Sequence, residues 1–243
     1  KTNTFTMQSS FFNAKVGIGL IFTNDKIGIH DDYGIYATYA YHLPITEKSK
    51  LSMGLQAGFN HLSSDFTMLN IRDMSDPNLF GRVTKMNPNF GAGLYYYAEN
   101  FYMGFSVPFM LENKLVDVES VLSEAKQSRN YYLNGGYTFT PNPNFKVTPS
   151  ILVRFQEGAP LGADINVMTS YKEIVGLGMS YRSNDAFIFL FQLRLFQNLH
   201  LGYAYDYTLS DLNQYSRGSH EILLNYRFQI PGIHKGLLCP AYL

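Results

Sequence analysis

Apolar and polar residues alternate along most of the chain. In Val16–Thr23, for example, the apolar positions are Val16, Ile18, Leu20 and Phe22. A period of two is typical of a β-strand that turns one of its sides toward an apolar environment. From this period we predict about thirteen strands. They cover Thr2–Ser10, Val16–Thr23, Tyr33–Leu43, Leu51–Phe59, Phe90–Tyr96, Phe101–Val107, Tyr131–Phe139, Phe145–Phe155, Ala163–Tyr171, Glu173–Arg182, Ala186–Phe196, Leu199–Tyr207 and His220–Phe228.

The connections between these segments alternate between short and long. Outer-membrane barrels have this layout, with short periplasmic turns and longer external loops, whereas a soluble sandwich has no reason to sort its loops by length. The short turns are expected at Ser10–Lys15, Thr46–Lys50, Ala98–Asn100, Pro141–Asn144, Tyr171–Glu173 and Gln197–Asn198. The long loops are expected at Asn24–Asp32, His61–Lys85, Phe109–Ser128, Gln156–Gly162 and Leu209–Gly218, and the short Ser183–Asp185 is the exception.

The number of predicted strands is odd, whereas bacterial single-chain barrels have even strand counts. If both termini lie in the periplasm, Thr2–Ser10 descends from the outside and an ascending strand precedes it. We therefore expect an all-β fold, a transmembrane up-and-down antiparallel β-barrel of about fourteen strands, with the first strand missing from this chain. Residues 1–228 would form the barrel, and residues 229–243 a periplasmic C-terminal tail.

The polar positions of the strands are rich in Gly, Ser, Thr, Asn and Gln and poor in Lys. This composition suits a confined lumen better than an open surface, where Lys and Glu are common. The charged residues at these positions are expected to form a structural ion-pair network in the lumen, and the alternative is a conduction or substrate path. They include Arg154, Asp164, Arg182, Arg194, Asp206, Glu221 and Arg227.

The overall composition excludes several classes of protein. Of the 243 residues, 46% are hydrophobic and 16% charged, with 19 basic and 19 acidic side chains. This balance argues against a nucleic-acid partner, which selects a basic excess, and against disorder, which goes with low hydrophobicity or high net charge. No apolar run reaches the length of about 18 residues that a transmembrane helix needs. Cys239 is the single cysteine, so an intrachain disulfide and a thiolate metal cluster are excluded.

No catalytic residue, metal ion or cofactor is expected. The glycine-rich run GAGLYYY at 91–97 lacks the GK[ST] ending of a phosphate loop and is better explained as a strand. Ser219 and His220 are adjacent in a predicted strand, so their side chains point to opposite faces and cannot act as nucleophile and base. The consecutive residues His30, Asp31 and Asp32 make a poor cation cage and are better read as a solvated loop.

Two long loops and the tail are the candidate partner-binding segments, because they carry many apolar residues outside the predicted strands. The alternative for the loops is a lid folded into the lumen, and for the tail a segment tucked into the barrel mouth. Val116–Lys126 has the spacing of a short amphipathic helix. The candidate residues are Met74, Leu79 and Phe80 in His61–Lys85, Leu115, Val118 and Leu122 in Phe109–Ser128, and Leu237 and Leu238 in the tail.

Several blocks of the sequence, in this order, resemble the PorP/SprF family, outer-membrane proteins of the type IX secretion system. They cover nearly the whole chain, and their combination is more specific than any single block. The blocks are VGIGLIFTNDKIG (16–28), YAYHLP (39–44), NPNFGAGLYYY (87–97), FYMGFSVPF (101–109), RNYYLNGGYTF (129–139), PSILVRFQEGAPLGADIN (149–166), GYAYDYTLSDL (202–212) and GSHEILLNYRF (218–228). Family members carry a signal peptide and further residues before the position that matches Lys1.

The resemblance implies an integral protein of the bacterial outer membrane that is not an enzyme. Its implied role is the secretion or surface anchoring of cargo, such as gliding adhesins. The implied partners are other type IX secretion components, the secreted surface protein or adhesin, a periplasmic peptidoglycan-binding subunit and the lipid bilayer, with no nucleic acid. From barrel size and aromatic content, the alternative function is an outer-membrane channel for hydrophobic small molecules.

Overall fold

Nearly all of the predicted alternating segments form β-strands. The computed structural model describes residues 1–68, 81–113, 127–210 and 218–228. Among these residues, no helix is long and apolar enough to cross a membrane. The elements are β1 (Thr2–Phe11), β2 (Val16–Ile27), β3 (His30–Thr46), β4 (Ser49–Asp65), η1 (Phe66–Met68), β5 (Arg82–Ala98), β6 (Phe101–Val107), β7 (Asn130–Tyr137), β8 (Phe139–Asn142), β9 (Phe145–Gln156), β10 (Gly162–Tyr171), β11 (Val175–Arg182), β12 (Ala186–Phe196), β13 (Leu199–Thr208) and β14 (Ser219–Tyr226).

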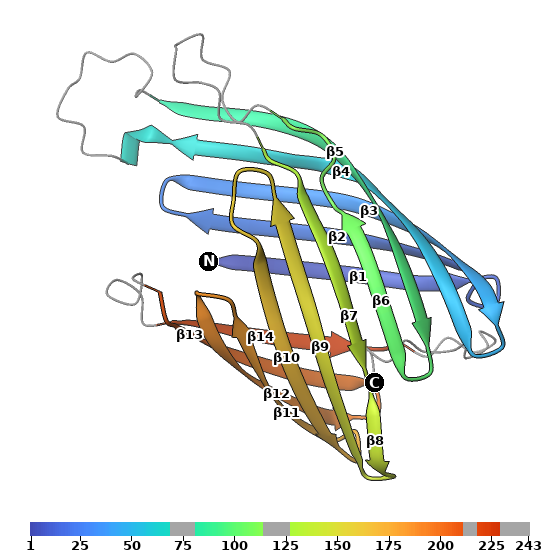
Figure 1. The fold of residues 1–243 in the computed structure, drawn as a ribbon. Coiled ribbons are helices and arrows are strands. Elements are labelled where there is room, and N and C mark those ends of the chain that lie inside the picture. The colour runs from blue at the N-terminus through green and yellow to red at the C-terminus, as the bar shows by residue number, and fades with distance from the viewer. Residues whose placement is uncertain (69–80, 114–126, 211–217, 229–243) are drawn as a thin grey trace. The chain divides into compact units, whose positions relative to one another are not determined.

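The strands follow one another in a single up-and-down antiparallel order (Figure 1). Hydrogen-bonded neighbours run β1-β2-β3-β4-β5-β6-β7-β9-β10-β11-β12-β13-β14, which places thirteen strands in the path, and β8 pairs with β9 beside it. The predicted strand Tyr131–Phe139 is interrupted at the buried Thr138, and β8 continues from Phe139 into the predicted turn Pro141–Asn144. The all-β, antiparallel fold expected from the sequence is therefore confirmed.

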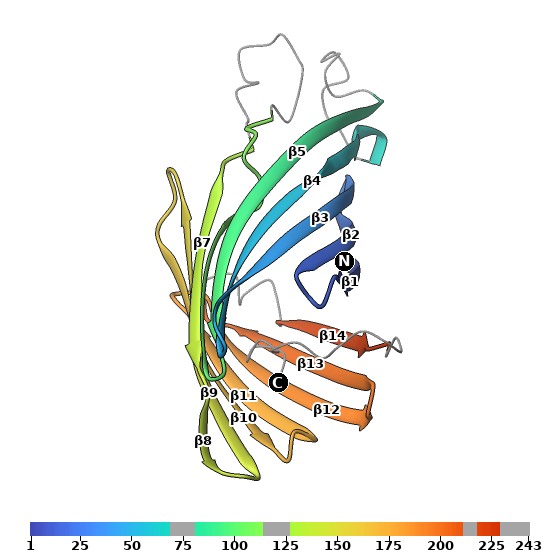
Figure 2. The ribbon, with the colours of Figure 1, turned by 90° about the vertical axis from the view of Figure 1, so that its right-hand side faces the viewer.

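The chain divides into two compact units. The first comprises Lys1–Leu43, Ser52–Leu94 and Ser106–Asn130, and the second Pro44–Leu51, Tyr95–Phe105 and Tyr131–Leu243. In the first unit β1 pairs with β2 without a bulge, and β2 pairs with β3. In the second unit β9 to β14 pair in sequence order, and Figure 2 shows these strands side by side. A shift in register occurs between Arg194 and Phe196.

Several strands are longer than the sequence pattern predicts. The expected loop Asn24–Asp32 is wrong, because β2 continues to Ile27 and β3 begins at His30, with only Gly28 and Ile29 between them. Gly28 has a φ of 59°, a left-handed conformation that glycine adopts without steric cost. β4 and β5 likewise extend into the expected loop His61–Lys85, which they shorten at both ends. Most residues in these extensions are polar on both faces, so the backbone pairs while the hydrophobic alternation is lost.

The burial of side chains is the reverse of that in a soluble β-protein. Large apolar side chains at alternate strand positions are exposed, for example Leu177 at 61% and Ile165 at 55%. Among the described residues the buried apolar side chains are Tyr36, Tyr97, Tyr102, Val107 and Ala186. The buried polar side chains are Ser49, Ser52, Ser63, Ser64, Asn87, Asn89, Thr138, Asp164 and Ser180. Exposed apolar side chains and buried small polar side chains therefore occur on opposite faces of many of the strands.

Glycine on the polar face allows bulky groups to lie close to the backbone. Tyr102 is stacked on Tyr95, with ring centroids 5.9 Å apart. A Cβ atom added at Gly136 would lie 2.6 Å from the Tyr102 ring, and one at Gly91 would lie 2.2 Å from the Pro108 carbonyl oxygen. Such distances exclude any side chain unless the neighbours move. The run GAGLYYY thus belongs to strand β5, which confirms the strand predicted for it.

Candidate functional site: a charged cluster on the polar face

Four of the charged residues identified in the sequence meet on the polar face of the second unit. Arg154 on β9 donates a hydrogen bond from Nη2 to Oδ1 of Asp164 on β10, at 2.9 Å. Nε of Arg182 on β11 lies 3.4 Å from the same Oδ1 atom. Arg182 Nη1 donates to Oδ2 of Asp206 on β13, at 3.2 Å. One chain of ion pairs therefore connects β9, β10, β11 and β13.

Strand register brings these side chains together. Asp164 lies directly opposite Arg182 across the β10–β11 pair, and Arg154 lies opposite Gly162 across the β9–β10 pair. The absence of a side chain at Gly162 leaves space beside Arg154, whose guanidinium nitrogens are 3.5 and 3.7 Å from where a Cβ would be. Asp185, in the connection between β11 and β12, adds a carboxylate 3.6 Å from Arg182 Nη1.

Asp164 is the most enclosed member of the cluster, with 7% of its surface exposed. A carboxylate taken out of water loses hydration, and this loss is offset only when opposite charges and hydrogen bonds replace it. Two guanidinium groups provide that replacement, because Arg154 and Arg182 both contact Oδ1. Removing either arginine would leave the carboxylate with one cationic partner in place of two.

A hollow of about 220 Å³ lies beside the cluster on the same face. Ser180 has 4% of its surface exposed, and its hydroxyl has no hydrogen-bond partner among the described residues. Glu221 on β14 lines the hollow without an ion pair in this part of the chain. The residues around the hollow are Leu152, Asp164, Asn166, Ser180, Arg182, Ile188, Leu190, Ala204, Asp206 and Glu221.

The other two charged residues predicted from the sequence, Arg194 and Arg227, lie toward the opposite ends of the strands from the cluster. Arg194 Nη1 is 3.8 Å from Oε2 of Glu173, in the turn between β10 and β11. Lys146 Nζ donates to the other oxygen of Glu173, and this hydrogen bond, followed by the charges of Lys146 and Arg194, lowers the pKa of the carboxyl group. The backbone N–H of Arg227 donates to the Asn198 carbonyl, at 2.8 Å, in the β12–β13 turn. The seven residues thus form two groups along the strands.

Sequence reasoning missed several members of these groups. Asp185 and Glu173 lie in connections, where the alternation of strands gives no signal. Lys146 and Asn166 occupy polar positions of predicted strands but were not singled out, and Ser180 has no distinguishing sequence feature. Asn166 and Ser180 lie opposite each other across the β10–β11 pair, two residues along from Asp164 and Arg182. Their place beside the cluster therefore follows only from the strand register.

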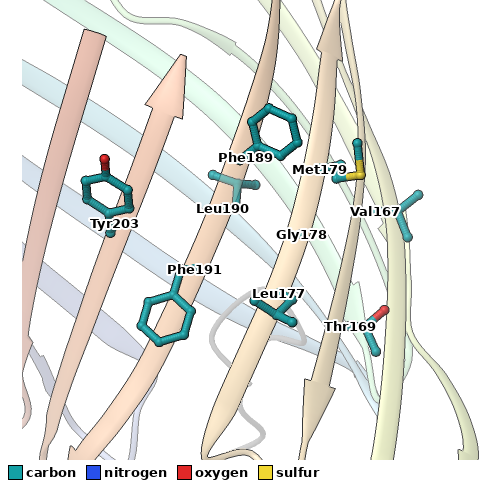
Figure 3. A pocket seen from close by; sticks show the side chains of 9 residues that line it. All are labelled: Val167, Thr169, Leu177, Gly178, Met179, Phe189, Leu190, Phe191 and Tyr203. Atoms are coloured by element: carbon teal, nitrogen blue, oxygen red, sulfur yellow. The ribbon is translucent and has the colours of Figure 1, made fainter. Parts of the chain in front are cut away.

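The apolar face of the same strands carries a groove of about 630 Å³. Figure 3 shows its lining side chains, which come from four consecutive strands, β10 to β13. Phe189 and Phe191 lie on β12, opposite Met179 and Leu177 of β11. An exposed apolar surface of this extent is unusual for a water-soluble monomer and is typical of a surface that contacts lipid or another protein.

The other chemistries considered in the sequence have no geometric support among the described residues. Nδ1 of His220 hydrogen-bonds to the Tyr203 hydroxyl group, at 2.7 Å, while Ser219 lies opposite Asp206. His30 lies in β3 rather than in a loop, and its Nδ1 hydrogen-bonds to the Ser64 hydroxyl at 2.8 Å. In the part of the chain that the structure describes, no three His, Cys, Asp or Glu side chains are placed to hold a metal ion.

The predicted partner-binding residues all lie outside the described residues. This holds for Met74, Leu79 and Phe80, for Leu115, Val118 and Leu122, and for Leu237 and Leu238. The predicted helix Val116–Lys126 and the single cysteine, Cys239, also lie outside the described residues.

Comparison with known proteins identifies the family. No curated protein gives a significant match to the chain. A family described as "Type IX secretion system membrane protein PorP/SprF" matches residues 1–226, which is nearly the whole chain. The antiparallel sheet and its exposed apolar face are consistent with a membrane-embedded β-barrel of this family. The chain therefore belongs to the PorP/SprF family of type IX secretion system membrane proteins.

Proposed function

We propose that this protein is a non-enzymatic, integral β-barrel of the outer membrane that supports the secretion or surface anchoring of type IX cargo, such as gliding adhesins. The observation that carries the proposal is the inverted burial pattern, with large apolar side chains exposed and Ser, Asn and Asp side chains buried, in a chain of this family. A bilayer reverses the usual solvent relationship, because the environment around the protein is apolar.

Aromatic pairs near the strand ends support a membrane location. Phe145 and Tyr171 lie with ring centroids 4.9 Å apart at the turn ends of β9 and β10, and Tyr137 and Phe139 lie 4.6 Å apart. Tyrosine is favoured at membrane interfaces, because its ring enters the apolar region while its hydroxyl stays hydrated. In the proposed barrel the polar face lines the lumen, and residues 1–228 form the barrel domain.

The proposed contacts with partners are made by the two long loops and by the tail. Loop residues Met74, Leu79, Phe80, Leu115, Val118 and Leu122 would bind cargo or other secretion components outside the membrane. Leu237 and Leu238, in the tail 229–243, would bind a periplasmic partner such as a peptidoglycan-binding subunit. The support is their apolar character at positions that fall between or after the strands.

A channel for hydrophobic small molecules is less well supported. Such a channel needs apolar side chains along its path, whereas the polar face of the second unit carries Asp164, Asn166, Ser180 and Asp206. The apolar groove of this unit is lined mainly by the opposite face, where Leu177 and Phe189 lie. We therefore favour protein secretion over solute transport.

Affinity purification tests this function. The tagged protein would be extracted gently from outer membranes, and the proteins that accompany it identified by mass spectrometry. We expect a secreted surface protein together with other type IX components. An unrelated barrel with the same tag, expressed at the same level, is the control for non-specific recovery. Recovery of the barrel alone, together with conductance or solute uptake in planar bilayers, would contradict the secretion role.

A pair of loop variants refines this test. Replacing Leu115, Val118 and Leu122 by serine should release the cargo if this loop binds it, and replacing Leu237 and Leu238 should release the periplasmic partner. Each variant is the matched control for the other, because both replace apolar residues by serine at positions that belong to none of the strands in the described part of the chain. Both variants should keep the heat-modifiable gel mobility of a folded barrel. Recovery of all partners by both variants would contradict these two binding surfaces.

A further inference from the structure

We propose that the hollow on the polar face of β9 to β14 binds a guanidinium or ammonium group, the chemistry of an arginine or lysine side chain. The site is separate from the loop and tail contacts proposed above, and it does not rest on the secretion role. The group could belong to a polypeptide that enters the lumen or to a small free cation, and the experiment below separates these two sources.

The charge around the hollow favours a cation. Its lining contains three carboxylates, Asp164, Asp206 and Glu221, and one guanidinium group, that of Arg182. Arg154 adds a second positive charge at Asp164, and Asp185 adds a fourth negative charge at Arg182. Carboxylates therefore outnumber guanidinium groups whether or not the flanking residues are included. An anion would be repelled by this excess, particularly where the strands screen the site from water.

Glu221 provides the free carboxylate of the site. Asp164 and Asp206 are both engaged by Arg182, at 3.4 and 3.2 Å. Glu221 lies opposite Ala204 across the β13–β14 pair, two residues from the Asp206–Ser219 pair on the same face. It has no ion pair among the described residues, and its side chain is exposed. A cation in the hollow would therefore meet a carboxylate that is accessible from the polar face.

Ser180 is an independent sign of a missing partner. Only 4% of this residue is exposed, its Oγ atom has no hydrogen-bond partner, and it lines the hollow. Buried hydroxyl groups in native proteins nearly always have a partner, in the protein, in water or in a ligand. Asn166 lies directly opposite Ser180 and offers an amide oxygen. Both oxygen atoms can accept N–H hydrogen bonds, which guanidinium and ammonium groups donate in several directions.

The size of the hollow and the state of its carboxylates exclude a simple metal site. A volume of about 220 Å³ is several times the roughly 30 Å³ that a water molecule occupies in the liquid. A hard divalent cation requires about six to eight closely placed oxygen ligands. Two of the three carboxylates are already bound to arginine, and the described residues hold no group with metal-ligand spacing. An organic cation needs fewer ligands and more space, which this hollow provides.

Titration of the purified, folded protein in detergent micelles tests the proposal. The probe is the peptide acetyl-Gly-Arg-Gly-amide, and the control peptide carries citrulline, which has nearly the same shape but no charge. We expect saturable binding of the arginine peptide by calorimetry and at least about tenfold weaker binding of the citrulline peptide, because charged hydrogen bonds are stronger than neutral ones. Equal affinity for the two peptides, or no saturable binding of the arginine peptide, would overturn the proposal.

Ethylguanidinium separates the two sources of the group. If it competes with the arginine peptide at a similar concentration, the guanidinium group alone is recognised and a free cation is sufficient. If only the peptide binds, the site selects a side chain carried by a polypeptide. Both results support a cation site, and they differ in the ligand that they assign to it.

Two substitutions connect the binding to the hollow. Glu221→Gln should weaken binding of the arginine peptide about tenfold by removing the free carboxylate, and Ser180→Ala should weaken it less. Glu157→Gln, in the connection between β9 and β10, removes an exposed glutamate outside the hollow and should change nothing. Binding that is equally strong in Glu221→Gln and wild type would place the peptide elsewhere and refute the site. Cargo recovery from membranes is measured separately, so failure of this proposal leaves the secretion role standing.

Discussion

Arg182 on β11 reaches across β12 to pair with Asp206 on β13, with Nη1 and Oδ2 3.2 Å apart. β11 and β13 are not neighbours in the sheet, because β12 lies between them. The register partner of Arg182 on β12 is Ala186, which is 1% exposed. Its single methyl group leaves space for the guanidinium group above the strand. This ion pair therefore joins two strands that are not neighbours, whereas a backbone ladder hydrogen bond joins only adjacent strands.

Reversing the charge of Asp206 should destabilise the protein. In Asp206→Arg, two guanidinium groups would meet where Arg182 now has a carboxylate, and the partly buried pair would be lost. We expect a loss of about 1–3 kcal/mol in unfolding free energy, measured as a lower melting temperature in detergent. The effect on stability should exceed any effect on secretion specificity. Glu157→Arg, at an exposed position outside the cluster, is the control. Unchanged melting with lost secretion would contradict a structural role.

Gly136 and Gly135 provide a steric test of the polar face. A Cβ at Gly136 would lie 2.6 Å from the Tyr102 ring, whereas one at Gly135 would have its nearest neighbour at 3.4 Å. Gly136→Ala should therefore displace Tyr102 and cost about 1–3 kcal/mol through overpacking. Gly135→Ala, one residue away on the opposite face, should change stability little. Thermal unfolding of both variants measures the difference, and equal melting temperatures would show that Tyr102 moves freely.

The fold was largely predictable from the sequence where one face of a strand is apolar. Val16–Thr23 and Ala186–Phe196 fall within observed strands, because the apolar side chains of one face recur there at every second position. The extension of β2 beyond Thr23 and of β3 before Tyr33 was missed for the opposite reason. Asn24, Asp25 and Lys26 pair with Tyr33, Asp32 and Asp31, but these mostly polar residues give no alternation. Backbone pairing continues beyond the last alternating apolar residue, so hydrophobic periodicity does not show where a strand ends.

The candidate site was predictable in its residue types but not in its grouping. Arg154, Asp164, Arg182 and Asp206 were identified from their polar strand positions, and they do meet. Whether they meet depends on the register between strands, which loop lengths and turn geometry fix. The hollow depends further on small residues such as Ala204, because a large side chain there would fill it. Such a space follows from several strands together and leaves no signal in any one of them.

Glu173 should make stability depend on pH in the acid range. The hydrogen bond from Lys146, with the positive charges of Lys146 and Arg194, holds the pKa of Glu173 below its ordinary value of 4.5. The ionised form is favoured in the folded state, so the stabilisation is complete above the ordinary pKa. It is lost as the pH falls through the lower, folded-state value. The side chain is partly exposed, so the effect should be modest and weaker at high salt.

Melting temperatures of wild type and Glu173→Gln, measured from pH 7 to pH 3, test this dependence. The advantage of the wild type should be constant near neutral pH and shrink in acid. Glu47→Gln, in the turn between β3 and β4, is the control, since Glu47 is exposed and has no ion pair among the described residues. An advantage of wild type over Glu173→Gln that persists unchanged at pH 3 would contradict the proposed contribution of this ion pair.

Leu177 and Gln192 distinguish a lipid-facing surface from a water-facing one. Leu177 is 61% exposed on the apolar face of β11, and Gln192 lies at nearly the same height on the polar face of β12, opposite Gly176. If the apolar face contacts lipid, Leu177→Arg should destabilise the barrel by up to about 2–4 kcal/mol, depending on its depth in the bilayer. Gln192→Arg should be tolerated, because its side chain would stay in an aqueous lumen. Folding titrations in lipid vesicles, with denaturant, measure both effects.

If the apolar face instead contacted water, Leu177→Arg should have little effect, since surface substitutions of this kind usually change stability by less than about 0.5 kcal/mol. A neutral Leu177→Arg would therefore contradict the membrane location of this face.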